Sequence, residues 1–92
     1  PVAVEVCTGA PLARLAIGAT GTVAQTYSTL RDSIGSSVVL DVMYSADGDE
    51  FEVVDGPVCA GPHYWYQVTH DGQTGWVTEG TGATYWLVPT SN

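Results

Sequence analysis

The chain has 92 residues, the length of one domain, and 45% of them are hydrophobic whereas 13% are charged. This hydrophobic share is enough for a globular core and argues against disorder. The net charge is −8, and Arg14 and Arg31 are the only strongly basic residues. Nucleic acid and anionic membrane surfaces are therefore poor partners, because neutralising phosphates needs several cations.

No run of residues approaches the roughly 18 consecutive apolar residues of a membrane-spanning helix, so no membrane span is expected. The chain starts at Pro1 without methionine, which leads us to expect a processed, mature form. A domain this short buries only about 60 to 65% of its unfolded surface, and covalent reinforcement is therefore expected.

Two cysteines, Cys7 and Cys59, permit a single pairing. A bridge between them would close a loop of about 53 residues and contribute on the order of 4 kcal/mol in the chain-entropy model. The alternative is a pair of buried free thiols. We predict the bridge, because metal sites use closely spaced ligand pairs and catalytic thiols need a nearby base, and neither pattern is present. The bridge implies an extracellular or cell-surface location.

The N-terminal residues 1–6 alternate apolar and other positions, which is typical of a half-buried strand. The inward-facing set is Val2, Val4 and Val6. This strand lies either at the edge of its own barrel or at the edge of another copy. Residues 8–20 are predicted to be irregular, because Pro11 and Gly18 interrupt them, and no long helix is expected in the chain.

Residues 21–27 are predicted to form the next strand, with Val23 facing inward, and residues 34–44 another, because that segment is rich in β-branched side chains. Residues 45–52 gather acidic side chains around Gly48 and are predicted to form a tight hairpin turn. Calcium is the alternative for this acidic run, but the run lacks the twelve-residue loop spacing with its distal glutamate, so we expect no metal.

Residues 55–62 are predicted to be a loop, since Pro57 and Pro62 cannot donate to a strand ladder. A glycine-rich loop follows at 79–84, and a closing strand at 85–88. Five or six short strands at spacings of about ten residues suit a small all-β barrel.

The clearest local signal is Asp71-Gly72, which lies between two β-prone runs and is typical of a two-residue type I′ hairpin turn. It pairs residues 63–70 with 73–78. In that register Tyr66 opposes Val77 and Val68 opposes Gly75, so these residues share one face. The other face holds Trp65, Gln67 and Trp76. We assign the valine face to the core.

The segments FEVVDGPVC, YWYQV, GQTGWV and YWLVP, together with Leu30-Arg31, resemble the bacterial Src homology 3-like domains of secreted and cell-surface proteins. The resemblance extends over residues 30–89. It implies a small barrel, which we assign to residues 8–92. Residues 1–7 are the added N-terminal strand that the alternation predicts, either kept or exchanged between subunits. The resemblance also implies that exposed aromatic residues line a groove for extended peptides or cell-wall glycopeptides.

The candidate contact residues are therefore aromatic, because flat rings give a large contact area at low entropy cost. They are Tyr64, Trp65, Trp76, Tyr85 and Trp86. A small barrel also needs large residues in its core. We accordingly expect Tyr66 and one of Tyr85 or Trp86 to be core, and Trp65 and Trp76 to lie at the surface.

Catalysis has little support, because His63 and His70 are the only histidines, no nucleophile elbow is present, and nothing selects two of the ten acids as a catalytic pair. We predict a non-enzymatic chain without cofactors. Two functions remain: a structural protein that self-associates by strand addition, or a cell-wall peptide- or glycan-binding module. We favour self-association, because no linker and no edge-protecting lysine is present.

Overall fold

The computed structural model describes residues 7–10, 13–82 and 84–90. Over this range the protein is all-β, with one 3₁₀ turn, η1, at Ser45–Asp47 and no α-helix. The strands are β1 (Thr20–Val23), β2 (Tyr27–Arg31), β3 (Val39–Tyr44), β4 (Glu50–Ala60), β5 (His63–His70), β6 (Gln73–Thr78), β7 (Gly80–Thr81), β8 (Thr84–Tyr85) and β9 (Leu87–Pro89).

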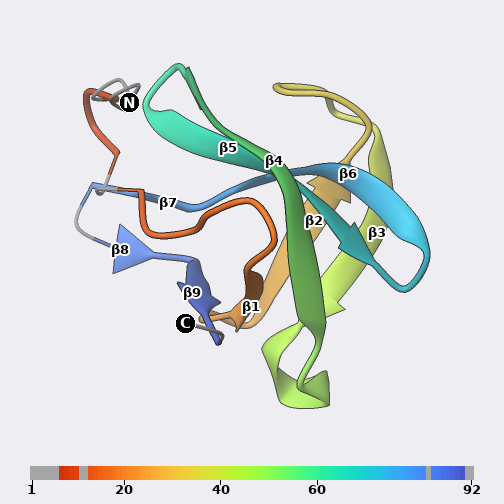
Figure 1. Cartoon of the computed structure of the whole chain (residues 1–92). Coiled ribbons are helices and arrows are strands. Elements are labelled where there is room, and N and C mark those ends of the chain that lie inside the picture. The colour runs from red at the N-terminus through yellow and green to blue at the C-terminus, as the bar shows by residue number, and fades with distance from the viewer. Residues whose placement is uncertain (1–6, 11–12, 83, 91–92) are drawn as a thin grey trace.

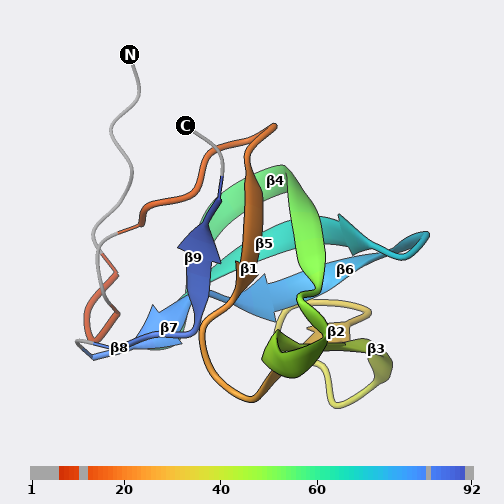
Figure 2. The same cartoon turned by 90° about the horizontal axis from the view of Figure 1, so that it is seen from below.

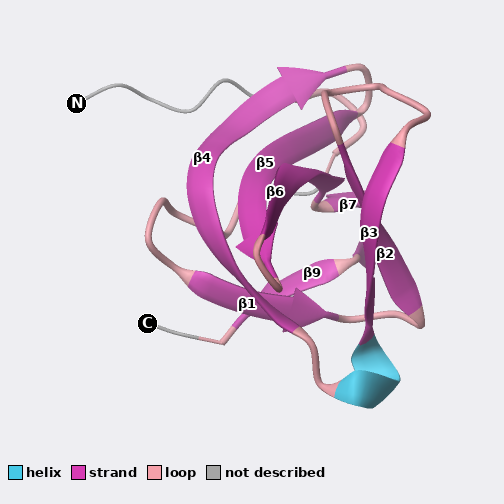
Figure 3. Ribbon diagram, turned by 90° about the vertical axis from the view of Figure 1, so that its right-hand side faces the viewer, coloured by secondary structure: helices cyan, strands magenta, loops and turns pink. Residues whose placement is uncertain are grey.

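Seven strands form one antiparallel sheet in the order β3-β2-β6-β5-β4-β1-β9, and β7 and β8 form a separate pair. The large sheet curls into a half-barrel (Figure 1). The long strand β4 follows this curvature and pairs with β5 and β1 at different parts of its length (Figure 3). β9 is the edge strand at the other end of the sheet and pairs with β1 (Figure 2). The all-β prediction is confirmed, with more strands in the sheet than the five or six expected.

The β5–β6 hairpin has the predicted turn and the predicted register. Asp71 and Gly72 both have positive φ, 52° and 81°, as a type I′ turn requires. Tyr66 opposes Val77 and Gln67 opposes Trp76. The short turn fixes this register, and the register in turn decides which side chains face the core.

The core lies on the face predicted from the hairpin. Tyr66, Val68 and Val77 are buried there. They join residues from most other strands, namely Val23, Leu30, Met43, Phe51, Val53 and Leu87. Gly75, opposite Val68, has no room for a side chain, because an added Cβ would lie 2.6 Å from the Arg31 carbonyl oxygen. Glycine here lets β2 approach β6 closely.

The strand predicted at 21–27 is wrong in its extent. β1 ends at Val23 and β2 begins at Tyr27. The chain changes direction between them, because β1 pairs with β4 and β9 whereas β2 pairs with β3. The strand predicted at 34–44 is present only as β3, from Val39 onward.

The hairpin predicted at 45–52 is also wrong, because β3 and β4 are not neighbours in the sheet. Instead, η1 follows β3 and ends at Gly48, which has a left-handed conformation with φ 68°. Pairing of Tyr27 with Tyr44 keeps β3 on β2, so the acidic turn connects two separated strands.

The loop predicted at 55–62 is instead mostly strand, since β4 continues to Ala60. Its register against β5 shifts between Val53 and Asp55 and again between Asp55 and Val58. The second shift spans Pro57, where a ladder hydrogen bond cannot form, so irregular pairing accommodates the proline without ending the strand.

The glycine loop predicted at 79–84 contains β7 and the start of β8, and the closing strand predicted at 85–88 is divided between β8 and β9. Trp86 separates them. Its backbone N–H donates to the Glu79 carbonyl at 2.7 Å, and its carbonyl accepts from Ala24 N–H at 2.8 Å. These two bonds bring Trp86 beside the start of the β2 segment.

Cys7 and Cys59 form the predicted disulfide, with sulfur atoms 2.15 Å apart and Cα atoms 5.4 Å apart. Such a bridge is typical of an oxidising compartment. Within the part of the chain that the structure describes, no helix has the length and apolarity needed to cross a bilayer. Val2, Val4 and Val6, the proposed interface strand, lie outside the described residues.

Candidate functional site

A groove with a volume of about 770 Å³ lies between β2, the loop from Gly35 to Ser37, the aromatic start of β5, and Trp86, which precedes β9. We call it the β2 groove. Its lining consists of aromatic, hydroxyl and amide side chains and one cation: Gln25, Thr26, Tyr27, Ser28, Thr29, Arg31, Gly35, Ser36, Ser37, His63, Trp65, Thr78 and Trp86.

Three aromatic rings line the β2 groove, two from the start of β5 and one, Trp86, from the segment between β8 and β9. Trp65 comes from β5 and opposes Thr78 of β6. The rings of His63 and Trp86 lie with their centroids 5.7 Å apart. His63 Nδ1 is 2.9 Å from the carbonyl oxygen of Gly80, a contact that orients the imidazole. The arrangement presents flat, partly fixed surfaces on which a ligand can stack.

β2 forms one wall of the groove, and alternate residues point the same way along a strand. Tyr27, Thr29 and Arg31 therefore form one row, and all three line the groove. On its other side β2 pairs with β3 along its length. Towards β6 it has a single pairing, Arg31 with Trp76, so among the described residues Tyr27 to Leu30 have no paired strand residue on that edge.

Arg31 is the only charged side chain in the groove lining. It is half-buried, and Nη1 donates to the Ser36 carbonyl at 2.9 Å. The two ion pairs found among the described residues both involve His70, so neither neutralises Arg31. The guanidinium has five N–H donors in a planar fork, and most of them remain available to a ligand.

Of the predicted contact aromatics, Trp86 lines the groove and is half-buried. Trp65 also lines it, but the prediction that it lies at the surface is wrong, because only 8% of the residue is exposed. The curled sheet and the neighbouring β2 segment enclose this face, which a flat sheet would have left open. Trp76 is half-buried and lies outside the groove lining.

Tyr64 and Tyr85 have other roles. Tyr64 is buried and its hydroxyl accepts a hydrogen bond from Cys7 N–H at 3.0 Å, so it is a core residue. Tyr85 is half-buried, and the Arg14 guanidinium lies 3.4 Å from its ring centroid. The expectation that Tyr85 or Trp86 would be core is wrong, because the fully buried residue of that segment is Leu87.

Sequence reasoning missed Tyr27, Arg31 and His63 as groove residues. The sequence singles out Arg31 only as one of two cations and as part of the Leu30-Arg31 pair. The available signal was strand alternation: Leu30 is buried, so Tyr27, Thr29 and Arg31 must face the opposite way. Their meeting with His63 depends on long-range pairing, which no local pattern reveals.

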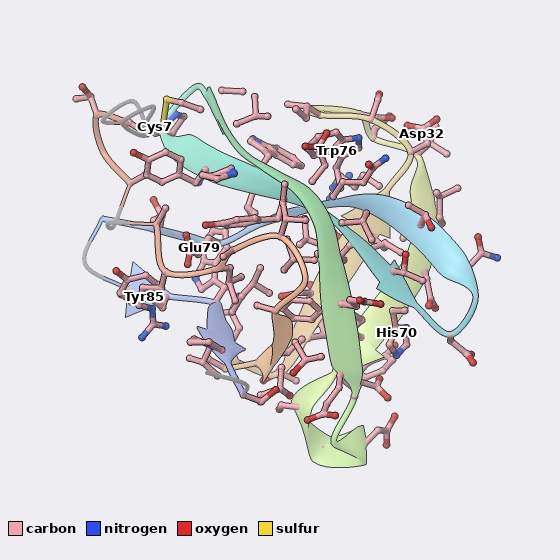
Figure 4. All side chains as sticks on the ribbon, in the orientation of Figure 1. Cys7, Asp32, His70, Trp76, Glu79 and Tyr85 are labelled. Atoms are coloured by element: carbon pink, nitrogen blue, oxygen red, sulfur yellow. A yellow bond between two sulfur atoms is a disulfide. The ribbon has the colours of Figure 1, made fainter. Side chains whose placement is uncertain are left out.

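Glu79, labelled in the left half of Figure 4, forms a second polar centre outside the groove lining. It is fully buried. Its Oε2 accepts a hydrogen bond from Arg14 N–H at 3.0 Å, and Oε1 has no hydrogen-bond partner among the described residues. Burial raises the pKa of this carboxyl above its usual value. The Arg14 N–H, the Tyr66 hydroxyl and the Arg14 charge favour the ionised form and offset part of this rise. The Glu79 backbone carbonyl also holds Trp86 and Leu87.

His70 forms a third polar cluster, at the end of β5. Its Nδ1 lies 2.7 Å from Asp41 Oδ2, and its Nε2 lies 3.5 Å from Asp49 Oδ1. Burial lowers the pKa of His70, but the hydrogen bond to Asp41 and the two negative charges outweigh it, so the pKa is raised. The hydrogen bond from His70 holds the pKa of Asp41 below its usual value, against the effect of burial.

The acidic turn thus places Asp49 against His70. Among the described residues, no group of three or more histidine, cysteine, aspartate or glutamate side chains is arranged to hold a metal ion.

No protein-family model matches the chain, and neither a curated protein nor a solved structure matches it.

Proposed function

We propose that this chain is a non-enzymatic extracellular or cell-surface domain of the Src homology 3-like type, which binds an extended cell-wall peptide or glycopeptide in the β2 groove. The observation that supports this best is the convergence of Trp65, Trp86 and His63 on a groove that is otherwise lined by hydroxyl groups. Ligand sites usually combine apolar walls with a few polar groups that orient the ligand.

The groove suits a chain-like ligand more than a compact one. β2 runs along it, and the lining continues from Gln25 to Ser37. An extended ligand can stack on the aromatic end and form hydrogen bonds with the hydroxyl groups along the wall. The disulfide supports an oxidising location, where cell-wall polymers are found.

The non-enzymatic assignment rests on the two histidines. The His63 ring is held by the Gly80 carbonyl, and His70 is held between Asp41 and Asp49. General-base catalysis needs an imidazole within hydrogen-bond reach of a nucleophile. Neither imidazole has a serine or threonine hydroxyl or a cysteine thiol among its hydrogen-bond partners in the described part of the chain.

Binding to purified bacterial cell walls tests this function. Trp86→Ala removes a stacking surface from the groove and should weaken binding at least tenfold, or about 1.4 kcal/mol, as expected for an aromatic contact residue. Trp76→Ala is the matched control, because this half-buried tryptophan lies outside the groove. The measurement is co-sedimentation over a range of wall concentrations.

Thermal unfolding of both variants checks that each is folded at the assay temperature. Equal affinity of native protein and folded Trp86→Ala protein for cell walls would refute the groove as the binding site.

A second function, self-association by strand addition, is favoured by the edge strand β3. Among the described strands, β3 pairs only with β2. Its exposed residues are apolar, with Val39 44% and Leu40 40% exposed. An unpaired apolar edge is a template for another strand, and the chain has no lysine to protect it. Residues 1–6 of another copy are the proposed donor, with Val2, Val4 and Val6 setting the register.

Sedimentation velocity and electron microscopy test this second function. Native protein should form assemblies, whereas Leu40→Lys and a truncation lacking residues 1–6 should both be folded monomers. Ile17→Lys is the control, because Ile17 is 65% exposed and lies outside the sheet. Native protein that stays monomeric at millimolar concentration would end this proposal without affecting the groove.

A further inference from the structure

We propose that the ligand of the β2 groove is an extended peptide that pairs with the free side of β2 and places one carboxylate on the guanidinium of Arg31. This inference rests on the proposed binding function and specifies its ligand. It assigns Arg31 as a ligand-binding residue.

One edge of β2 is open to an added strand over most of its length. β2 is joined to β6 only at Arg31 and Trp76, so within the described part of the chain Tyr27 to Leu30 have no paired strand residue on that side. Backbone N–H and C=O groups strongly require hydrogen-bond partners. A peptide backbone has matching donors and acceptors at the same spacing and can add as a strand. A glycan lacks this repeat, so the open edge favours a peptide.

The positive charge of Arg31 is available to a ligand in the groove. Its guanidinium lines the groove, and its one recorded hydrogen bond is from Nη1 to the Ser36 carbonyl. The adjacent Asp32 carboxylate is exposed and accepts instead from the Ser33 hydroxyl at 3.4 Å. Among the residues that the structure describes, no acidic side chain lines the groove. An arginine held in this way is complementary to a carboxylate, which it can bind through two parallel N–H···O bonds.

The net charge limits how acidic the ligand can be. The protein has ten acidic residues and a net charge of −8, so a run of carboxylates would be repelled from most of the surface. For a single carboxylate close to Arg31, attraction to the guanidinium exceeds this repulsion, because repulsion from distant exposed acids is screened beyond about 10 Å at 0.1 M salt. The expected peptide therefore has one carboxylate among uncharged, β-prone residues.

The position of Trp86 sets the length of the peptide. Its carbonyl accepts from Ala24 N–H, so Trp86 lies by the start of the β2 segment, and Arg31 is at the end of β2. The strand from Tyr27 to Arg31 spans roughly 13 Å at about 3.3 Å per residue. A peptide with an aromatic residue and a glutamate about four residues apart would reach both.

Isothermal titration calorimetry with synthetic peptides tests the inference. The probe is acetyl-Tyr-Thr-Val-Thr-Glu-Thr-amide, whose Tyr and Glu are four residues apart, and its partner has Gln in place of Glu. The same pair is made with reversed residue order, because an added strand can run in either direction. Native protein should bind one Glu peptide at least tenfold more tightly than its Gln partner, since a hydrogen-bonded charge pair is lost.

Two variants assign the preference to Arg31. Arg31→Gln should reduce the Glu-over-Gln ratio to below about twofold, and Arg31→Lys should retain part of it because the charge remains. Arg14→Gln is the matched control: it removes the other cation, which lies on the Tyr85 ring and outside the groove. This control should keep the full ratio. An N-methylated Glu peptide should lose binding if the backbone pairs with β2.

Three results would overturn the inference. Equal binding of Glu and Gln peptides by native protein would remove the carboxylate while leaving the groove as a peptide site. Retention of the ratio in folded Arg31→Gln protein would place the carboxylate elsewhere. Failure of every peptide to bind, while cell-wall binding persists and is lost in Trp86→Ala, would identify a glycan as the ligand and leave the proposed function standing.

Discussion

His70 connects three segments that are far apart in the sequence. It lies in β5, Asp41 lies in β3, and Asp49 follows η1. The side chain of His70 is only 12% exposed, so the contact is partly shielded from solvent. Asp49 also accepts a hydrogen bond from Tyr44 N–H through Oδ2. One imidazole therefore links β3 and the residue that follows Gly48 to the hairpin.

This cluster predicts a pH dependence of stability. The pKa of His70 is raised in the folded state. Its contribution to the free energy of unfolding is therefore fully present below about pH 6.5 and is lost as the pH rises through the folded-state pKa. The pKa of Asp41 is lowered in the folded state. Its contribution to the free energy of unfolding is therefore lost only in acid, as the pH falls through the lowered pKa. We expect the free energy of unfolding to decline from pH 6 to pH 9 by up to about 1 kcal/mol through this pair.

Asp41→Asn is the variant that isolates the effect, measured by urea unfolding at several pH values. Glu79 also has a raised pKa, and its buried charge lowers stability with rising pH as well, so the native slope alone is ambiguous. The difference between native protein and Asp41→Asn removes the Glu79 contribution, which both share. Parallel curves for the two proteins between pH 6 and pH 9 would contradict the assignment to His70.

Residue identity predicted some contacts and not others. Two cysteines allow one pairing, so the disulfide followed from the sequence. The burial of Glu79 did not, because glutamate is rarely fully buried and nothing beside it in the sequence pairs with it. Its partner is the backbone N–H of Arg14, 65 positions away. Contacts of that kind arise only when distant strands are placed together.

At the level of elements, the β5–β6 hairpin was predictable because its turn, its alternation and its register are all local. β4 was not, because Gly56 and Pro57 are typical of a loop, whereas pairing with β5 keeps this segment in the sheet. Tertiary pairing overrides local preference there. The break between β1 and β2 was missed for the same reason, since each strand has different partners.

The groove shows the same limit at the next level of organisation. Its aromatic nature was predictable from the tryptophan-rich segments, and Trp65 and Trp86 do line it. Its location was not, because it requires the gap between β2 and β6, which follows from their single pairing position. The curl of the sheet then turned Trp65 from the expected surface residue into a buried groove wall.

Over the whole molecule, the segment from Cys7 to Ala19 closes one side of the half-barrel without forming a strand where it is described. Leu15 is buried in it, and both its N–H and its C=O bond to the Tyr66 hydroxyl, at 3.3 and 3.1 Å. The disulfide holds the start of the segment on β4. The segment is thus attached both through a covalent bond and through core hydrogen bonds.

The disulfide should accordingly determine how stable the domain is without determining its fold. Its two cysteines are 52 positions apart, and removing a closure of that length costs about 4 kcal/mol in the chain-entropy model, against a total of about 5 to 15 kcal/mol for a typical domain. The double variant Cys7→Ala, Cys59→Ala should lose most of that amount in guanidinium unfolding. The Tyr66 and Glu79 contacts should keep it folded at low temperature, with native near-ultraviolet circular dichroism. Native protein in reductant is the control and should behave in the same way.

An unchanged unfolding midpoint in both would mean that the bridge contributes nothing to stability. A double variant lacking the native dichroism at every temperature would mean that the bridge, and not the Leu15 and Glu79 contacts, holds the segment in place.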